Sequence, residues 1–132
     1  MLAHGKGRSL APWSRVFLDI GFPTVWRRRR EENVRRALKL LAAVPGVRPI
    51  FSRWPAGHCP FNVVLEFPSE DACTACYTRL AAAGVYTAAH WILPPGGPSA
   101  LVALSRRVRT LPVDYRYHEE DLVRAIKVIR SE

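Results

Sequence analysis

The sequence predicts an α+β domain with a small, largely antiparallel sheet and helices packed on one face. Two observations carry this prediction. The 132 residues are 48% hydrophobic and 23% charged, which is typical of one globular domain. Short segments with helical and strand-like patterns also alternate in the order helix, strand, strand, helix, strand, strand, helix. The apolar runs are far shorter than the ~20 residues of a membrane helix, so no membrane association is expected.

The first 23 residues predict a poorly ordered leader, because glycine, proline and serine interrupt isolated hydrophobic residues. The leader can still dock through its large apolar side chains, which are Trp13, Val16, Phe17 and Ile20. A single domain is expected over residues 24–132. Its first helix runs from Thr24, as N-cap, to about Ala43, and Pro45 and Gly46 end it.

The middle of the chain predicts two strands and a helix. Residues 47–52 and 61–67 are rich in β-branched and aromatic types, which favour strands. Ser69 is placed to cap a helix that runs to about Ala83, and Gly84 follows at the position where helices commonly end in a left-handed residue.

The last third predicts a strand at 85–91, a Pro- and Gly-rich loop, a short helix at 99–105 and a strand at 107–111. A turn at 114–117 leads into a final helix. Glu119, Glu120 and Asp121 lie in its first turn, where acidic side chains favour the positive end of the helix dipole. Adjacent residues on a helix diverge, so this trio does not predict acid–base catalysis.

The charge of +9 is concentrated near the beginning of the chain, and 17 of the 20 basic residues are arginine. One hypothesis is therefore a small nucleic-acid-binding module, with Trp13 and Trp26 available for base stacking. Its phosphate contacts would come from the arginines of the first long helix, which are Arg27, Arg28, Arg29, Arg30, Arg35 and Arg36. Preference for arginine over lysine also follows from a GC-rich coding background, so charge alone does not establish this function.

The three cysteines favour a cytoplasmic protein, because their number is odd and nothing resembles a signal peptide. Cys73 and Cys76, with His58 and Cys59, could form a zinc or redox site. Cys73 and Cys76 also continue the apolar stripe of their predicted helix, which favours core packing and no metal. No histidine lies in a nucleophile motif, and no glycine-rich phosphate loop is present.

Several segments together resemble the C-terminal part of the DegT/DnrJ/StrS aminotransferases, which are fold-type I pyridoxal-phosphate enzymes. The resemblance covers about residues 24–132. It begins with Arg30 and Asn33, continues through Phe51 and residues 59–61, and includes residues 80–91, 105–117 and 120–122. Their order and spacing carry the resemblance more than any single motif.

The resemblance implies a small domain that packs against a large cofactor-binding domain and helps to close the substrate site. The chain lacks that large domain, so it is expected to be a catalytically incomplete fragment that binds no cofactor alone. Pyridoxal phosphate would belong to a complete enzyme. None of Lys6, Lys39 and Lys127 is assigned as its Schiff-base lysine. The expected partners are a separately encoded large domain or a second copy of this chain, and a truncated-gene remnant without a function of its own is a further alternative.

The matched positions also suggest residues on the substrate side of such an enzyme, namely His90, Trp91, Arg116 and Tyr117. A structural interpretation competes for each pair. Trp91 would then lie in the core with His90 exposed, and Tyr117 would pack locally while Arg116 pairs with Asp114.

Overall fold

A three-stranded antiparallel sheet forms the centre of the domain. The computed structural model describes residues 11–21, 23–55 and 58–131. The strands lie in the order β1-β2-β3, with Val63 opposite Leu111 and Pro49 opposite Leu65. In chain order the elements are α1 (Pro12–Ile20), α2 (Thr24–Leu41), β1 (Arg48–Pro49), β2 (Asn62–Glu66), α3 (Glu70–Ala82), α4 (Ser99–Arg106), β3 (Val108–Pro112) and α5 (Glu119–Arg130).

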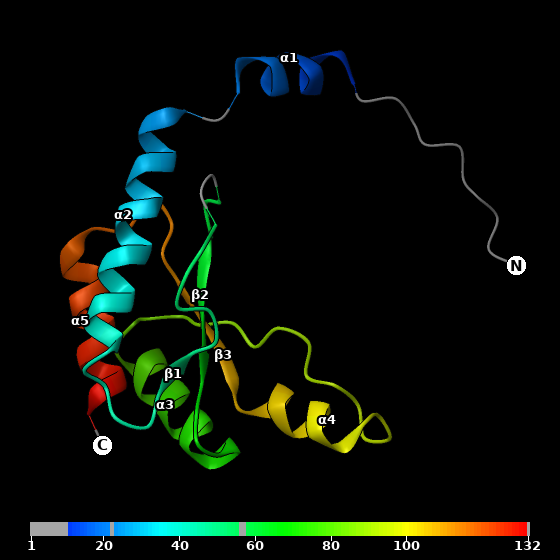
Figure 1. The fold of residues 1–132 in the computed structure, drawn as a ribbon, viewed down its shortest axis with the longest axis vertical. Helices are drawn as coiled ribbons and strands as arrows, with labels where there is room; N and C mark the ends of the chain where they lie inside the picture. Colours follow the sequence, from blue (N-terminus) through cyan, green and yellow to red (C-terminus); the bar gives the residue numbers. More distant parts are fainter. Residues whose placement is uncertain (1–10, 22, 56–57, 132) are drawn as a thin grey trace, which may run out of the picture.

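Helices α2, α3 and α5 cover one face of this sheet, and α4 lies at the end of the sheet, near the beginning of α3 (Figure 1). Alternation along β2 points Val63 and Leu65 into the core, because successive side chains of a strand point to opposite faces. The helices meet them with apolar stripes, which include Val34, Ala37, Leu41, Cys73, Cys76, Leu80, Leu122, Ala125, Ile126 and Ile129. The predicted α+β class and the one-sided helical layer are confirmed.

The ends of α3 follow the predicted signals. The hydroxyl oxygen of Ser69 accepts a hydrogen bond from the backbone N–H of Ala72 at 3.1 Å. Gly84 follows the helix with φ of +72°, a conformation that costs glycine little. The prediction for Thr24 is wrong, since the cap position of α2 is Pro23 and Thr24 is already helical.

The predicted strand at 85–91 is absent from the sheet that the described residues form. Only one bridge joins this segment to β3, between Ala88 and Thr110, whose backbone N–H donates to the Ala88 carbonyl at 3.0 Å. At Trp91 the backbone has φ of +62°, in the left-handed region. A residue in that conformation turns the chain away, so the ladder does not continue.

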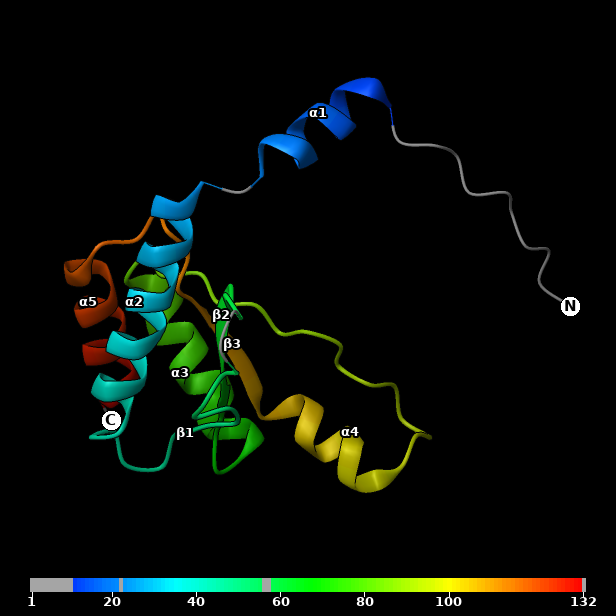
Figure 2. The same cartoon turned by 45° about the horizontal axis from the view of Figure 1, so that its top comes forward.

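The leader contains a helix that the sequence analysis did not predict. Figures 1 and 2 show α1 extending beyond the beginning of α2, away from the sheet. Three side chains expected to dock are exposed instead, with Trp13 at 77%, Val16 at 50% and Ile20 at 74%. The side chain of Phe17 and residues 1–10 lie outside the described part. No helix among the described residues is both long enough and apolar enough to span a bilayer.

Candidate functional site

The most closely connected polar cluster surrounds Asp114, in the turn before α5. Its carboxylate accepts hydrogen bonds from the backbone N–H of Tyr115 at 2.6 Å and from the side chains of Arg116 at 2.8 Å and Arg30 at 3.3 Å. Asn33, buried in α2, donates to the carbonyl oxygens of Asp114 and Tyr117 at 2.8 and 3.0 Å. The cluster fixes the turn onto α2, because every bond crosses between or lies within these two segments.

The electrostatics of the cluster favour the charged carboxylate. Burial of Asp114 opposes ionisation, but the Tyr115 N–H and the guanidinium groups of Arg116 and Arg30 outweigh it and hold the pKa of Asp114 below its usual value. Contact with the same carboxylate raises the pKa of Arg116. The expected local pairing of Arg116 with Asp114 is confirmed.

The arginines proposed for nucleic-acid binding are divided among different partners. Arg30 is a core-side residue, with a side chain only 14% exposed and a guanidinium 5.4 Å from the centre of the Phe61 ring. Arg27 pairs with Glu31 at 3.2 Å. Trp26, the proposed stacking residue, lies against Tyr115 with ring centres 4.4 Å apart and planes 5° apart.

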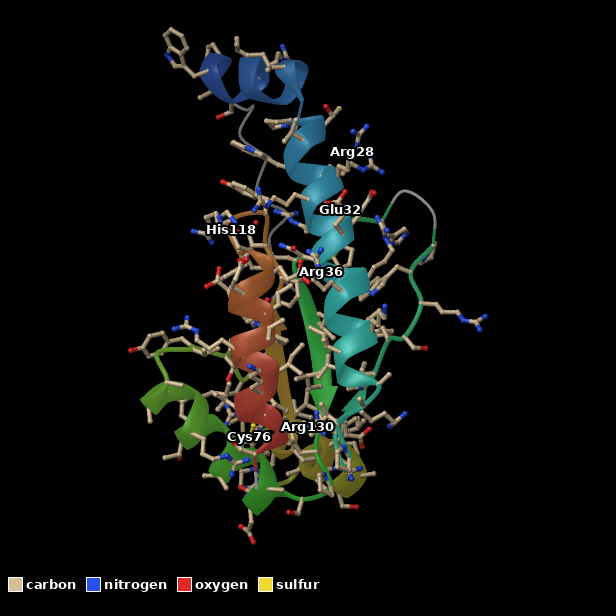
Figure 3. All side chains as sticks on the ribbon, turned by 90° about the vertical axis from the view of Figure 1, so that its left-hand side faces the viewer. Arg28, Glu32, Arg36, Cys76, His118 and Arg130 are labelled. Carbon is tan, nitrogen blue, oxygen red and sulfur yellow. The ribbon has the colours of Figure 1, made fainter. Side chains whose placement is uncertain are left out.

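Two more of these arginines face the beginning of α5. Arg36 pairs with Glu119 at 2.9 Å, and Arg29 lies 2.7 Å from Nδ1 of His118. Figure 3 shows Arg36 and His118 on the side where α2 and α5 meet. Among the residues that the structure describes, Arg28 and Arg35 have no ion-pair partner. The Arg-rich helix is therefore largely matched by groups of its own chain.

The four substrate-side candidates fall into two separate places. Tyr117 is half-buried, beside Gly84 and Leu111 near the end of β3. His90 and Trp91 lie two and three residues beyond the Ala88 bridge, in the direction of α4. The antiparallel register carries that segment toward the beginning of β3, so the structure does not bring the two pairs together.

Trp91 is a surface residue. Its side chain is 69% exposed, and the neighbouring His90 is also exposed, with the two ring centres 6.3 Å apart. The interpretation of Trp91 as a core residue is wrong. Strand-like composition suggested burial, whereas the positive φ turns this side chain outward.

Exposed apolar side chains gather on the same part of the chain. Ile92 is 58% exposed and Leu101, on α4, 52% exposed, whereas the exposed Tyr86 lies on the other side of the Ala88 bridge, beside Tyr117. The backbone N–H of Leu93 donates to the hydroxyl of Ser105 at 3.1 Å, which ties this segment to α4. We call Trp91, Ile92 and Leu101 the outer apolar surface. Large exposed apolar groups concentrated in adjoining segments are typical of a surface that meets another protein.

The two cysteines of the CxxC spacing lie in the core, as predicted. Cys73 and Cys76 are fully buried, and burial raises the pKa of both thiols despite nearby arginines. His58 is exposed and Cys59 half-buried. Within the described ranges, no group of three or more potential metal ligands is placed to hold an ion.

The described lysines do not fit a pyridoxal-phosphate site. Such a cofactor needs a lysine in a pocket that favours the neutral amine. Lys39 and Lys127 are both exposed on helix surfaces, and Lys6 lies outside the described residues. These side chains offer the cofactor no enclosed site within this chain.

Comparison with known proteins establishes the fold. No family model matches the sequence, and no curated protein matches it. The aminotransferase TlmJ from Streptoalloteichus hindustanus is similar in structure, with a TM-score of 0.66 and 24% identity over 79% of this chain and 31% of that one. The sugar aminotransferase CalS13 from Micromonospora echinospora has a TM-score of 0.66 and 22% identity, over 80% of this chain and 30% of that one. A DegT DnrJ EryC1 StrS aminotransferase from Brucella abortus has a TM-score of 0.62 and 24% identity, over 79% of this chain and 30% of that one.

The resemblance expected from the motifs is thus confirmed for the fold. The chain has the fold of part of the DegT/DnrJ/StrS-type sugar aminotransferases. It spans about 30% of the length of each. The remainder of those enzymes has no counterpart among these 132 residues.

Proposed function

We propose that this chain is the small domain of a pyridoxal-phosphate-dependent sugar or amino-acid aminotransferase, catalytically incomplete by itself. A large domain outside these 132 residues would complete it, working in the reducing cytoplasm. The observation that supports this most directly is the outer apolar surface, together with a fold that corresponds to about 30% of its structural neighbours.

The backbone at Trp91 adds a physical argument. A tryptophan with positive φ costs roughly 1–3 kcal/mol, and this one also exposes most of its ring. Nothing inside the described domain offsets either cost. A partner that covers the Trp91 ring would offset these costs. We therefore assign His90 and Trp91 to the side that faces the large domain. Arg116 and Tyr117 would stabilise the turn before α5 within this chain.

The cofactor would belong to the large domain. Because Lys39 and Lys127 are exposed on helix surfaces, this chain is expected to bind no pyridoxal phosphate on its own. Titration of the purified chain with pyridoxal phosphate should give no imine absorbance beyond that of exposed lysines, and a saturable, pocket-bound imine would contradict the assignment.

Affinity purification of the tagged chain from its native cells tests the partner. The expected result is co-purification of a polypeptide that carries bound pyridoxal phosphate, identified by mass spectrometry and absorbance. Trp91→Ala with Ile92→Ser should abolish capture, whereas Val25→Ser, a matched change at a residue 71% exposed on α2, should not. Capture without a cofactor-binding protein, or capture that both variants retain, would contradict the proposal.

Nucleic-acid binding is the alternative function. Its phosphate contacts would come chiefly from Arg28 and Arg35, since the other four arginines of α2 contact groups of this chain. Two contacts correspond to a slope of about −1.8 in log K against log salt for duplex DNA. Duplex binding at low salt with a slope of at least this size would favour this alternative, and failure to bind DNA or RNA at low salt would exclude it.

A further inference from the structure

Helix α1 has one apolar face that the structure leaves uncovered. Trp13, Val16 and Ile20 follow one another at i, i+3 and i+7, which places them on a single side of the helix. Arg15 lies on the opposite side by the same periodicity. An isolated helix of nine residues is unstable in water, so α1 needs a surface to pack on.

A groove of matching character lies between α2 and the loop that follows β1. Its volume is about 610 Å³, and its apolar lining comes from Val34, Leu38, Trp54, Pro55 and Pro60. Leu38 and Trp54 pack against the core from this side, so the floor of the groove is fixed. We call these five residues the α2 groove. The three apolar side chains of α1 occupy roughly 350 Å³, which the groove accommodates.

The α1 helix of the same chain does not reach this groove in the structure. Gly21 has φ of +74°, and Pro23 has φ of −53° and ψ of 125°, so the connection directs α1 away from α2. Figures 1 and 2 show the same arrangement, with α1 beyond the beginning of α2 rather than alongside it. The groove of each chain is therefore open to a helix from elsewhere.

We propose that α1 of one copy docks in the α2 groove of a second copy, and that the reciprocal exchange forms a two-fold symmetric dimer. Exchange of identical elements closes the assembly, because each copy supplies one helix and one groove. The apolar side chains of α1 expose about 400 Å² per copy. Covering both helices and the smaller surfaces that line the two grooves buries about 1,100 Å² in total, just above the roughly 1,000 Å² that a specific interface needs.

The charges agree with this arrangement. Glu31, Arg35 and Arg53 surround the groove opening, and Arg15 remains on the solvent side of a docked helix. An apolar centre with a mixed polar rim is the usual anatomy of a specific interface. The proposal does not depend on the aminotransferase-like function, since it uses neither the outer apolar surface nor the turn at Asp114.

Sedimentation equilibrium of the full chain tests the proposal, with Val16→Asp as the interface variant. Val16 is half exposed in the single chain, so the variant is expected to fold. A buried carboxylate at both symmetric contacts should raise the dimer dissociation constant about 100-fold or more. Ser14→Asp makes a similar charge change away from the apolar face and should leave the constant unchanged. A wild-type chain that stays monomeric at every concentration, or a dimer that Val16→Asp does not weaken, would overturn the proposal.

Cysteine pairing separates exchange between copies from closure within one copy. In a Cys59→Ser background, one population carries Val16→Cys on α1 and another carries Ser52→Cys at the groove. Oxidation of the mixture should give a disulfide-linked heterodimer. If a chain carrying both changes cross-links only within itself, or if α1 instead binds phosphatidylserine vesicles while the chain stays monomeric, docking between copies is wrong.

Discussion

Loss of the carboxylate charge of Asp114 should lower the stability of the domain strongly, and Asp114→Asn tests this. The asparagine keeps the shape and one acceptor oxygen but replaces the charge with an amide. Arg30, whose side chain is 14% exposed, would lose its counter-charge inside the domain. Removing one member of a buried ion pair costs about 3–5 kcal/mol.

The contribution of each contact gives a closer value for the expected loss in free energy of unfolding. Arg116 is 66% exposed, so solvent screening limits its pair with Asp114 to less than about 1 kcal/mol. Arg30 and the Tyr115 N–H both donate to Oδ1, the oxygen that asparagine keeps, so each bond weakens from about 1.5–3 to about 0.5–1.5 kcal/mol when the charge is lost. We expect a loss of about 3 kcal/mol, which lowers Tm by about 12 °C for a domain of this size.

Urea and thermal unfolding followed by circular dichroism provide the assay. Asp71→Asn, at an exposed residue in the first turn of α3, is the matched control and should change stability by less than about 0.5 kcal/mol. Because the folded protein holds the pKa of Asp114 below its unfolded value, this stabilisation is present above the usual carboxyl pKa. It is lost as the pH falls through the lowered folded pKa. A variant within about 0.5 kcal/mol of wild type at neutral pH would refute the reasoning.

Three further outcomes are expected. Ser69→Ala should cost about 1 kcal/mol in urea unfolding because a cap is lost, whereas Thr24→Ala should cost much less, and equal losses would contradict the assigned caps. A thiol reagent should modify Cys59 in the native protein and reach the two buried thiols only on unfolding; rapid reaction of all three would show an open core. Trp91→Gly should raise the free energy of unfolding by up to about 1 kcal/mol, and Tm with it, because glycine adopts positive φ without strain. The same variant should weaken capture of the partner.

Features encoded by local pattern were predictable from the sequence. The apolar stripe of α2 and the β-branched run of β2 place Val34, Leu41, Val63 and Leu65 in the core as expected. Ser69 acts as a cap because its side chain needs only a neighbouring N–H. These interactions span a few residues, so spacing alone specifies them.

Features that depend on distant partners were predicted less well. Arg30 was grouped with the other arginines as a phosphate contact, yet it lies one turn before Val34 on the buried side of α2 and pairs with Asp114. Extending the apolar stripe backwards by one turn would have indicated this. The outward turn at Trp91 had no such signal, because strand propensity does not report a positive φ.

The contacts of Asn33 with the turn before α5 have a consequence for how the chain folds. Asn33 binds the carbonyl of a residue 81 positions later, so α2 lacks its main packing partner until α5 exists. At ordinary rates of synthesis the two helices emerge roughly 4–16 s apart. Closing so long a loop before the core forms gives a high contact order and a slow nucleus. During that interval the apolar stripe of α2 is accessible to chaperones, and completion of the native domain is expected only after translation of its final helix.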